Sequence, residues 1–351
     1  MKSHIWLRSE TKDHERRTPL TPIGAQQLIQ DGHIVTVEKC NDRIIKDSDY
    51  QNVGCQLVDA LSWKTAPKET IILGLKELPE NESDPLIHKH IFFGHAFKGQ
   101  AGATELLKRF KSGGGSLYDL EYLIDENQRR VAAFGFWAGF TGAAAAMDSW
   151  ADLSQGKDFS PLHDYEHQDE WIASLKKRLI GQAPNVMVVG AKGRCGSGAL
   201  TLLKKIGIFP TSWDYQETKE GGPFKKIAEH DVFINTALIN TKIPPFINEE
   251  ILEDQALSII CDVSCDPSGE LNPIPLYDRA GSWQKPLQSK LLAGKIRHIL
   301  AVDNLPSLLP KESSEDFAEQ LLPHLRSFAS DHSNSIFERS LAFFKSHSDK
   351  I

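Results

Sequence analysis

The chain is poor in cysteine, has no excess of positive charge and contains no long uninterrupted apolar segment. Five cysteines in 351 residues, an odd and sparse set, favour a reducing compartment over a disulfide framework. No segment approaches the roughly 18 consecutive apolar residues that cross a membrane, and the N-terminal MKSHIWLRSETKDHERR has no apolar signal-peptide core. The net charge of −7 offers no basic surface for nucleic acid. We therefore expect a cytoplasmic protein that binds neither membranes nor nucleic acid.

Three short patterns suggest metal ligands, and each lacks part of a site. CDVSC at 261–265 has no second cysteine pair, and HKH at 88–90 with His95 has no acidic residue or cysteine at a suitable spacing. HDYEH at 163–167 matches the H-x-x-E-H pattern of one class of zinc peptidases, but it lies in a polar stretch and not in an apolar helix. We predict no metal site. A zinc hydrolase that uses HDYEH is kept as one alternative function.

Apolar runs alternate with helical patterns, which is typical of a parallel sheet flanked by helices. IWLRSE, IVTVEK, IILGLK and IFFGHA read as strands, and TPIGAQQLIQDG reads as a helix between two of them. Residues 129–153 read as one long buried helix, and the polar stretch 154–170 reads as an irregular surface insertion. The sequence assigns no role to the stretch 152–180. A second strand–helix series begins at NVMVVG, and the tail from Lys311 is amphipathic and helical. The pattern predicts an α/β fold of two halves around an interdomain cleft.

A glycine-rich turn, GAKGRCGSGA at 190–199, follows the strand NVMVVG and precedes a helix. Its glycines do not give the strict G-x-G-x-x-G of the dinucleotide fingerprint, and no G-K-[ST] makes it a P-loop. Asp214 ends the next strand 24 residues after Gly190, close to the offset of an acid that accepts ribose hydroxyls. No basic residue immediately follows Asp214, which favours NAD over NADP. A merely structural turn stays open as the alternative.

Charged residues follow the predicted strands of the N-terminal half. Arg17, with Glu15 nearby, is suited to hold a substrate carboxylate, although a surface salt-bridge loop is the favoured explanation of this segment taken alone. The carboxyl ends of parallel strands are where such folds place chemistry. Lys76 and Glu77 end one strand, and His95 and Lys98 follow the next. A partly buried lysine can act as a base and a histidine can move protons.

Several segments together resemble one enzyme family. They are ERRTPLTP, SWKTAP, IILGLKELPE, HKHIFFGHAFKGQAG, SLYDLEYL, RRVAAFGFWAGFTGAA, GRCGSGA, WDYQETKEGGPF and DNLPSLLPKESSE. They closely resemble the NAD-dependent, lysine-forming saccharopine dehydrogenases of the alpha-aminoadipate pathway, within the wider alanine dehydrogenase family. The resemblance implies two Rossmann-like domains joined by long helices: residues 1–131 plus 312–351 for substrate and catalysis, and 132–311 for NAD. It implies reversible oxidative deamination of saccharopine to L-lysine and 2-oxoglutarate by a monomer.

The resemblance also implies roles for individual residues. Lys76 would take the proton from the secondary amine, and His95 would move protons during imine hydration and carbinolamine collapse. The substrate-side residues implied are Arg17, Lys98, Glu77, Glu121 and Arg130, the two glutamates tuning charge near the base. The cofactor-side residues implied are Gly193, Arg194, Cys195, Gly196, Asp214 and Asp303.

One departure from the family pattern concerns Cys195. Fungal-type members carry a cysteine where this sequence has Thr236. A disulfide from Cys195 to that position is therefore not expected, and redox control that depends on it is in doubt.

Two alternatives remain open at this stage. One is a related alanine or opine-type amino-acid dehydrogenase; alanine dehydrogenase would need a small pocket, whereas saccharopine needs room and cations for three carboxylates. The other is a non-catalytic NAD-binding regulator, against which the presence of both Lys76 and His95 argues. The sequence fixes neither the physiological direction of the reaction nor the oligomeric state.

Overall fold

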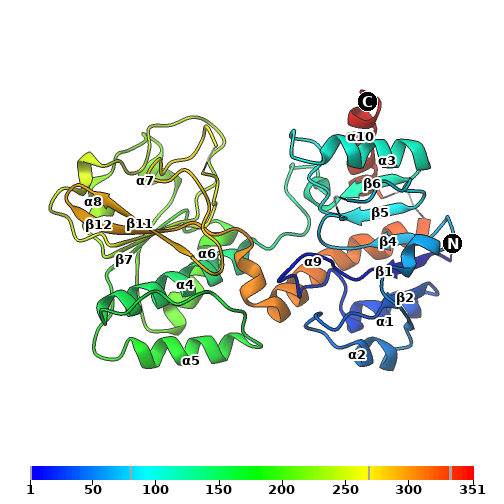
Figure 1. The fold of residues 1–351 in the computed structure, drawn as a ribbon, viewed down its shortest axis with the longest axis horizontal. Coiled ribbons are helices and arrows are strands. Elements are labelled where there is room, and N and C mark those ends of the chain that lie inside the picture. The colour runs from blue at the N-terminus through cyan, green and yellow to red at the C-terminus, as the bar shows by residue number, and fades with distance from the viewer. Residues whose placement is uncertain (1, 80, 268, 332–333) are drawn as a thin grey trace. The chain divides into compact units, whose positions relative to one another are not determined.

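The computed structural model describes residues 2–79, 81–267, 269–331 and 334–351. The chain forms two compact units (Figure 1). The first comprises Met1–Ala133 and Pro310–Ile351, and the second comprises Phe134–Leu309. The C-terminal segment thus returns to the unit that the N-terminus begins. No helix among the described residues has the length and apolar character needed to span a bilayer.

The first unit is built on a six-stranded sheet in the order β3-β2-β1-β4-β5-β6, and every pair in it is parallel. Parallel strands are covered on both faces, so they read as short, wholly apolar runs. IIL of β4 is completely buried for this reason. The strands are β1 (His4–Leu7), β2 (Ile34–Glu38), β3 (Gln56–Val58), β4 (Ile71–Leu73), β5 (Lys89–Phe92) and β6 (Ser116–Asp119).

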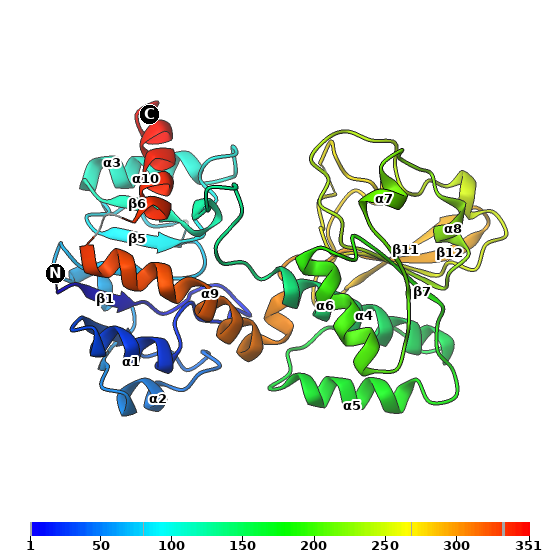
Figure 2. The same ribbon diagram turned by 180° about the vertical axis from the view of Figure 1, so that it is seen from behind.

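Helices connect and cover these strands. Thr21 caps the first helix by accepting the Gly24 N–H, and Pro22 occupies the first helical turn, as the sequence predicts. The C-terminal helices return to the first unit, with α9 running across its strands and α10 lying beside β6 (Figures 1 and 2). The helices are α1 (Pro22–Gln30), α2 (Asp47–Asn52), α3 (Ala103–Gly113), α9 (Pro310–Asp331) and α10 (Ser335–Ser348).

The second unit is also a six-stranded sheet, in the order β11-β12-β10-β9-β7-β8. Its β11–β12 pair is an antiparallel hairpin at the edge of an otherwise parallel sheet. The hairpin closes through Ala293 and Gly294, both at positive φ, and such a short connection permits only antiparallel pairing. The strands are β7 (Val186–Val189), β8 (Thr211–Trp213), β9 (Val232–Asn235), β10 (Ile259–Asp262), β11 (Leu287–Leu292) and β12 (Lys295–Leu300).

The small residues of the long helix allow close helix packing in this unit. A Cβ at Gly139 would lie 1.7 Å from the Cys195 carbonyl oxygen, and one at Gly198 would lie 1.8 Å from the Phe136 carbonyl oxygen. The backbones of α4 and α6 therefore touch directly. The helices of the unit are α4 (Gly135–Ser154), α5 (Gln168–Arg178), α6 (Arg194–Lys205), α7 (Tyr215–Thr218) and α8 (Lys225–Ala228).

Two expectations are corrected. The long buried helix begins at Gly135, not at residue 129, because the preceding residues form a turn closed by an Ile124–Arg130 bridge. The polar stretch 154–170 is irregular only as far as His167, since α5 begins at Gln168 and runs to Arg178. Trp171 of α5 is 1% exposed and its ring stacks on Tyr165. The sequence did not predict α5, because its three buried residues, Trp171, Ile172 and Leu175, stand among many charged ones.

Candidate active site

The carboxyl edge of the first sheet gathers the charged residues that the sequence singled out. Lys76 and Glu77 follow β4, His95 follows β5, and Glu121 lies in a short 3₁₀ helix after β6. Because β4, β5 and β6 are adjacent and parallel, their carboxyl ends meet at one edge. The structure thus brings these groups together as predicted.

Glu77 and His95 form an ion pair across two strand ends. The Nδ1 atom of His95 lies 2.5 Å from one carboxylate oxygen of Glu77, and the Lys12 ammonium lies 3.1 Å from the other. Burial on its own would raise the pKa of Glu77, but the hydrogen bond from His95 and the charges of His95 and Lys12 lower it to about 2. The same hydrogen bond raises the pKa of His95. The Nε2 atom of His95 hydrogen-bonds to no described residue and is the ring atom that can exchange a proton with a substrate.

The backbone at His95 is held in an uncommon conformation. Its φ is 47°, in the left-handed region that side chains other than glycine rarely adopt. The preceding residue, Gly94, donates its N–H to the Asp119 carboxylate at 3.1 Å, which fixes the turn. Burial raises the pKa of Asp119 to about 6. Strained positions of this kind concentrate at functional sites.

Arg17 is engaged by its neighbour. Its guanidinium donates to both carboxylate oxygens of Glu15, at 2.8 and 2.6 Å, and both side chains are almost fully buried. Burial would raise the pKa of Glu15, but Arg17 and then the Lys76 ammonium hold it low. The surface-loop alternative for this pair is therefore wrong, because the pair is buried and lies within electrostatic reach of Lys76.

Glu121 bridges two cations. Its Oε1 accepts from the Lys98 ammonium at 2.8 Å and from Arg130 at 2.6 Å. Burial would raise the pKa of Glu121, but Lys98 and Arg130 hold it low. Lys98 and Arg130 are exposed while Glu121 is largely buried, so the carboxylate anchors two cations at the surface.

The glycine turn of the second unit has a distinct role for each glycine. Gly190 has a φ of 86°. A Cβ at Gly196 would lie 2.2 Å from the Gly190 carbonyl oxygen, so Gly196 lets α6 approach the turn. A Cβ at Gly193 would meet only that same oxygen, at 3.2 Å, which leaves space before the first turn of α6. Backbone N–H groups of a helix N-terminus bind phosphate oxygens, so the turn fits a dinucleotide despite its spacing.

Asp214 lies beside this turn, directly after β8. Its carboxylate accepts the Lys192 N–H of the turn at 2.7 Å and the Tyr215 N–H at 2.8 Å. These backbone hydrogen bonds hold the pKa of Asp214 low despite partial desolvation. The acid is thus ionised, partly exposed and oriented at the end of the second strand of this Rossmann-type unit, the position from which an acid can accept ribose hydroxyls.

The remaining cofactor-side residues lie in the same unit. Arg194 opens α6, and Cys195 follows it as a free thiol whose pKa is raised by burial. Thr236 donates its hydroxyl to the Val189 carbonyl oxygen at 2.7 Å. Asp303 follows β12 and accepts the Asn304 N–H at 2.7 Å.

Two residues that the sequence reasoning missed support this edge of the first sheet. Glu10 accepts backbone N–H groups from the Lys76 segment, and Asp119 accepts that of Gly94. Glu10 follows the first strand. The rule that charged residues after parallel strands are site candidates, which identified Lys76 and His95, would therefore also have identified Glu10. Asp119 ends the apolar run SLYD, and a charged residue at the end of a buried strand was the available signal.

Histidines of both histidine-containing metal patterns pack against aromatic side chains. His90 in β5 and His88, just before that strand, are both buried, with ring centroids 5.1 and 6.2 Å from that of Trp63. HDYEH lies in the loop before α5, where His163 packs on Tyr165. In the ranges that the structure describes, no three His, Cys, Asp or Glu side chains are grouped to hold a metal ion.

Known proteins share this architecture. Residues 6–141 match the family "Alanine dehydrogenase/PNT, N-terminal domain" and residues 215–346 match "Alanine dehydrogenase/PNT, C-terminal domain". The fold resembles that of an L-alanine dehydrogenase, with a TM-score of 0.69, 16% identity and 99% of each chain covered. It also resembles a transhydrogenase from Sinorhizobium meliloti, with a TM-score of 0.62, 17% identity and 93% and 94% covered. The chain thus has the two-domain fold of the alanine dehydrogenase class.

Sequence relatives define the family within this class. A saccharopine dehydrogenase [NAD(+), L-lysine-forming] of Neurospora crassa is 44% identical, covering 97% of this chain and 95% of its own. That of Emericella nidulans is 46% identical over 92% and 91%, and that of Schizosaccharomyces pombe 42% over 92% of each. The chain belongs to the family of NAD⁺-dependent, L-lysine-forming saccharopine dehydrogenases. The resemblance seen in the sequence is confirmed.

Proposed function

We propose that this chain catalyses the reversible, NAD-dependent oxidative deamination of saccharopine to L-lysine and 2-oxoglutarate. The observation that carries the proposal is near-full-length identity of 42–46% to enzymes named for this reaction. The sheet edge with Lys76, Glu77 and His95 supplies the acid–base groups that the reaction needs. The alanine dehydrogenase alternative is not favoured, since that likeness is only 16% identical.

Lys76 and His95 divide the proton transfers. Oxidation of a secondary amine needs a base that removes the amine proton, and Lys76 is our candidate. Hydrolysis of the imine then needs a group that deprotonates water and later protonates the leaving amine. His95 can do both through Nε2, because Glu77 holds the opposite ring nitrogen. Glu77 and Glu121 set the charge around these two groups.

The cationic groups of the first unit suit a substrate with three carboxylates. Lys98 and Arg130 are exposed cations, and both are held by Glu121. Arg17 contributes positive charge beside Glu15, and its planar guanidinium has the geometry that matches a carboxylate. We assign Arg17, Lys98 and Arg130 to substrate carboxylates.

The second unit provides the cofactor site. Bound NAD⁺ would accept the hydride. Gly193, Arg194, Cys195 and Gly196 form the turn and first helical residues that would hold the pyrophosphate, and Asp214 would accept ribose hydroxyls. We assign Asp303, after β12, to the cofactor side as well. We further propose that the enzyme is a cytoplasmic monomer, which light scattering of the purified protein and cell fractionation would test.

A single assay tests the reaction. Purified protein is mixed with NAD⁺ and either saccharopine or L-alanine, and NADH formation is followed at equal substrate concentrations; the saccharopine arm is repeated with NADP⁺. We expect turnover of saccharopine with NAD⁺, and much slower turnover with NADP⁺ or alanine. Robust turnover of alanine alone would overturn the proposal. The same measurement distinguishes a non-catalytic regulator, which would give NAD binding without turnover.

A further inference from the structure

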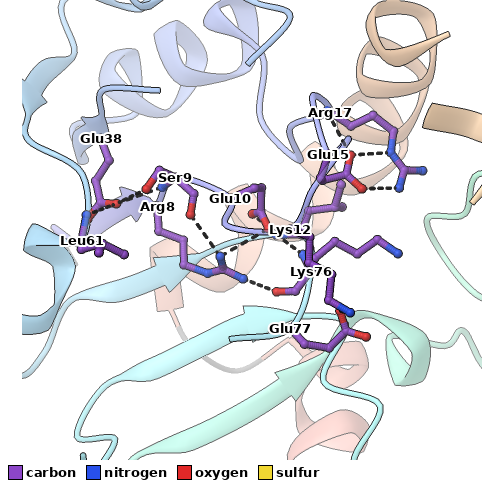
Figure 3. Close-up of polar contacts among 11 residues, drawn as sticks. Arg8, Ser9, Glu10, Lys12, Glu15, Arg17, Glu38, Leu61, Lys76 and Glu77 are labelled. Atoms are coloured by element: carbon purple, nitrogen blue, oxygen red, sulfur yellow. Dashed lines mark hydrogen bonds and ion pairs between the residues drawn. The ribbon is translucent and has the colours of Figure 1, made fainter. Parts of the chain in front are cut away.

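A buried ion pair surrounds the backbone of Lys76 (Figure 3). Arg8 and Glu10 follow β1, and their side chains are 1% and 6% exposed. Both side chains turn to the segment after β4, the strand that pairs with β1. Two charges withdrawn from water are costly, so their partners indicate what the pair holds in place.

Glu10 binds the amide side of this segment. One carboxylate oxygen accepts the Leu75 N–H at 2.7 Å, and the other accepts the Lys76 N–H at 2.9 Å. The second oxygen also accepts from the Arg8 guanidinium at 3.3 Å. A single carboxylate therefore fixes two successive peptide groups, at the residue we assign as the base and the one before it.

Arg8 binds the carbonyl side. Its guanidinium donates to the Lys76 carbonyl oxygen and, at 3.1 Å, to that of Ser9. The guanidinium occupies the space that a side chain at position 74 would fill. A Cβ on Gly74 would lie 2.2 to 2.6 Å from three of its atoms. The glycine of the GLKE segment is thus explained by the arginine that lies against it.

We propose that the Arg8–Glu10 ion pair positions Lys76 for catalysis by clamping both peptide groups of that residue. The inference rests on the proposed function, in which Lys76 is the base. Arg8 and Glu10 act through Lys76 and are positioning residues. Lysine has a long side chain, so a shift of its backbone also shifts the position that its ammonium can reach. Displacement of a reacting group by about 1 Å can cost roughly 100-fold in rate.

The first experiment is Glu10→Gln, assayed with saccharopine and NAD⁺. A glutamine amide nitrogen cannot accept a backbone N–H, so one of the two peptide hydrogen bonds is lost. We expect kcat to fall about 10- to 100-fold, with KM for NAD⁺ within about threefold. The matched control is Asp47→Asn in the same unit. The Asp47 carboxylate also accepts a backbone N–H, from Cys40, and pairs with Arg43, but it does not contact the Lys76 segment. Its kcat should stay within about twofold.

A double-mutant cycle separates positioning from general structural support. If Glu10 acts through Lys76, Glu10→Gln should change the residual rate of the Lys76→Met enzyme by less than about threefold. An undiminished effect in the Lys76→Met background, or an unchanged kcat in Glu10→Gln alone, would overturn the inference. If the unmodified chain forms no NADH from saccharopine, the proposed function fails and this inference fails with it.

Two further variants guard against loss of folding. Arg8→Met/Glu10→Gln removes both charges together and leaves neither unpaired. Gly74→Ala displaces the guanidinium without changing any charge. Both should reproduce the kcat loss with normal KM for NAD⁺ and a normal circular dichroism spectrum. Wild-type kcat in either folded variant would contradict the role of the pair.

Discussion

The imidazole Nδ1 of His95 lies 2.5 Å from the carboxylate of Glu77, so two adjacent strand ends of the first unit share one ion pair. The pair lowers the pKa of Glu77 to about 2 and raises that of His95. It also fixes which ring nitrogen faces the carboxylate, leaving Nε2 for proton exchange. The strength of this contact makes the pH dependence of the enzyme predictable.

Glu77→Gln should move the His95-dependent limb of the kcat/KM–pH profile to lower pH. The largest cause of the raised pKa of His95 is its hydrogen bond to Glu77, and a neutral amide does not replace the carboxylate charge. The measurement is the pH profile of saccharopine oxidation. Glu82→Gln is the control, because Glu82 pairs with Lys64 and Arg109 in the same unit and has no histidine partner. A profile unchanged by Glu77→Gln would refute the coupling.

The Glu77–His95 pair should also make the stability of the fold depend on pH in a defined direction. A raised histidine pKa stabilises the fold below pH 6.5 and loses that contribution as pH rises through the folded value. A lowered glutamate pKa stabilises above about pH 4.5 and loses that contribution as pH falls toward 2. The Tm difference between wild type and Glu77→Gln should therefore be largest between about pH 4.5 and 6.5, as thermal melts across pH would measure. A difference that grows outside this window would contradict the assignment.

Lys76→Met should abolish most turnover while cofactor binding persists. Removal of a general base typically costs about 10² to 10⁴ in rate. The measurements are NADH formation from saccharopine and fluorescence titration with NADH. The matched control is Lys64→Met, since Lys64 is another ion-paired lysine of the same unit, bound to Glu82. Equal losses in both variants would point to charge or folding and not to the base.

Asp214→Asn should weaken NAD binding about tenfold, because hydrogen bonds to a charged acceptor are worth about 1.5–3 kcal/mol. KM for saccharopine should change little. Asp231→Asn is the control, since Asp231 also accepts a backbone N–H, from Asn185 at 2.8 Å, but precedes β9 at the opposite end of the sheet. An Asp214 variant with normal KM for NAD⁺ would remove it from the ribose site.

Two glycine variants separate packing from cofactor space. Gly196→Ala forces a Cβ to 2.2 Å from a backbone oxygen, so we expect a stability loss of about 1–3 kcal/mol and a lower Tm. Gly193→Ala meets only one atom, at 3.2 Å, and its φ of −72° suits alanine. It should melt like wild type and still bind NAD⁺ more weakly. A Gly193→Ala enzyme with wild-type NAD⁺ affinity would show that the turn does not contact the pyrophosphate.

The sequence by itself determined the strand–helix alternation and the family. Apolar runs such as IIL that alternate with helical patterns are typical of a covered parallel sheet, and polar residues that follow neighbouring strands of such a sheet lie at one edge. Lys76, Glu77 and His95 were found by this rule alone. Helix α5 was missed because its few buried residues are scattered among charges.

Only the tertiary structure decided which charges pair. Arg17 is bound to Glu15, and the clamp on Lys76 joins strand ends 65 or more residues apart. Such pairing depends on strand order and register, which local sequence does not encode. The roles of the individual glycines in the turn at 190–199 likewise depend on which backbones pack against them. Gly196 and Gly198 are required by the backbones packed against them, while Gly193 alone leaves space for a ligand.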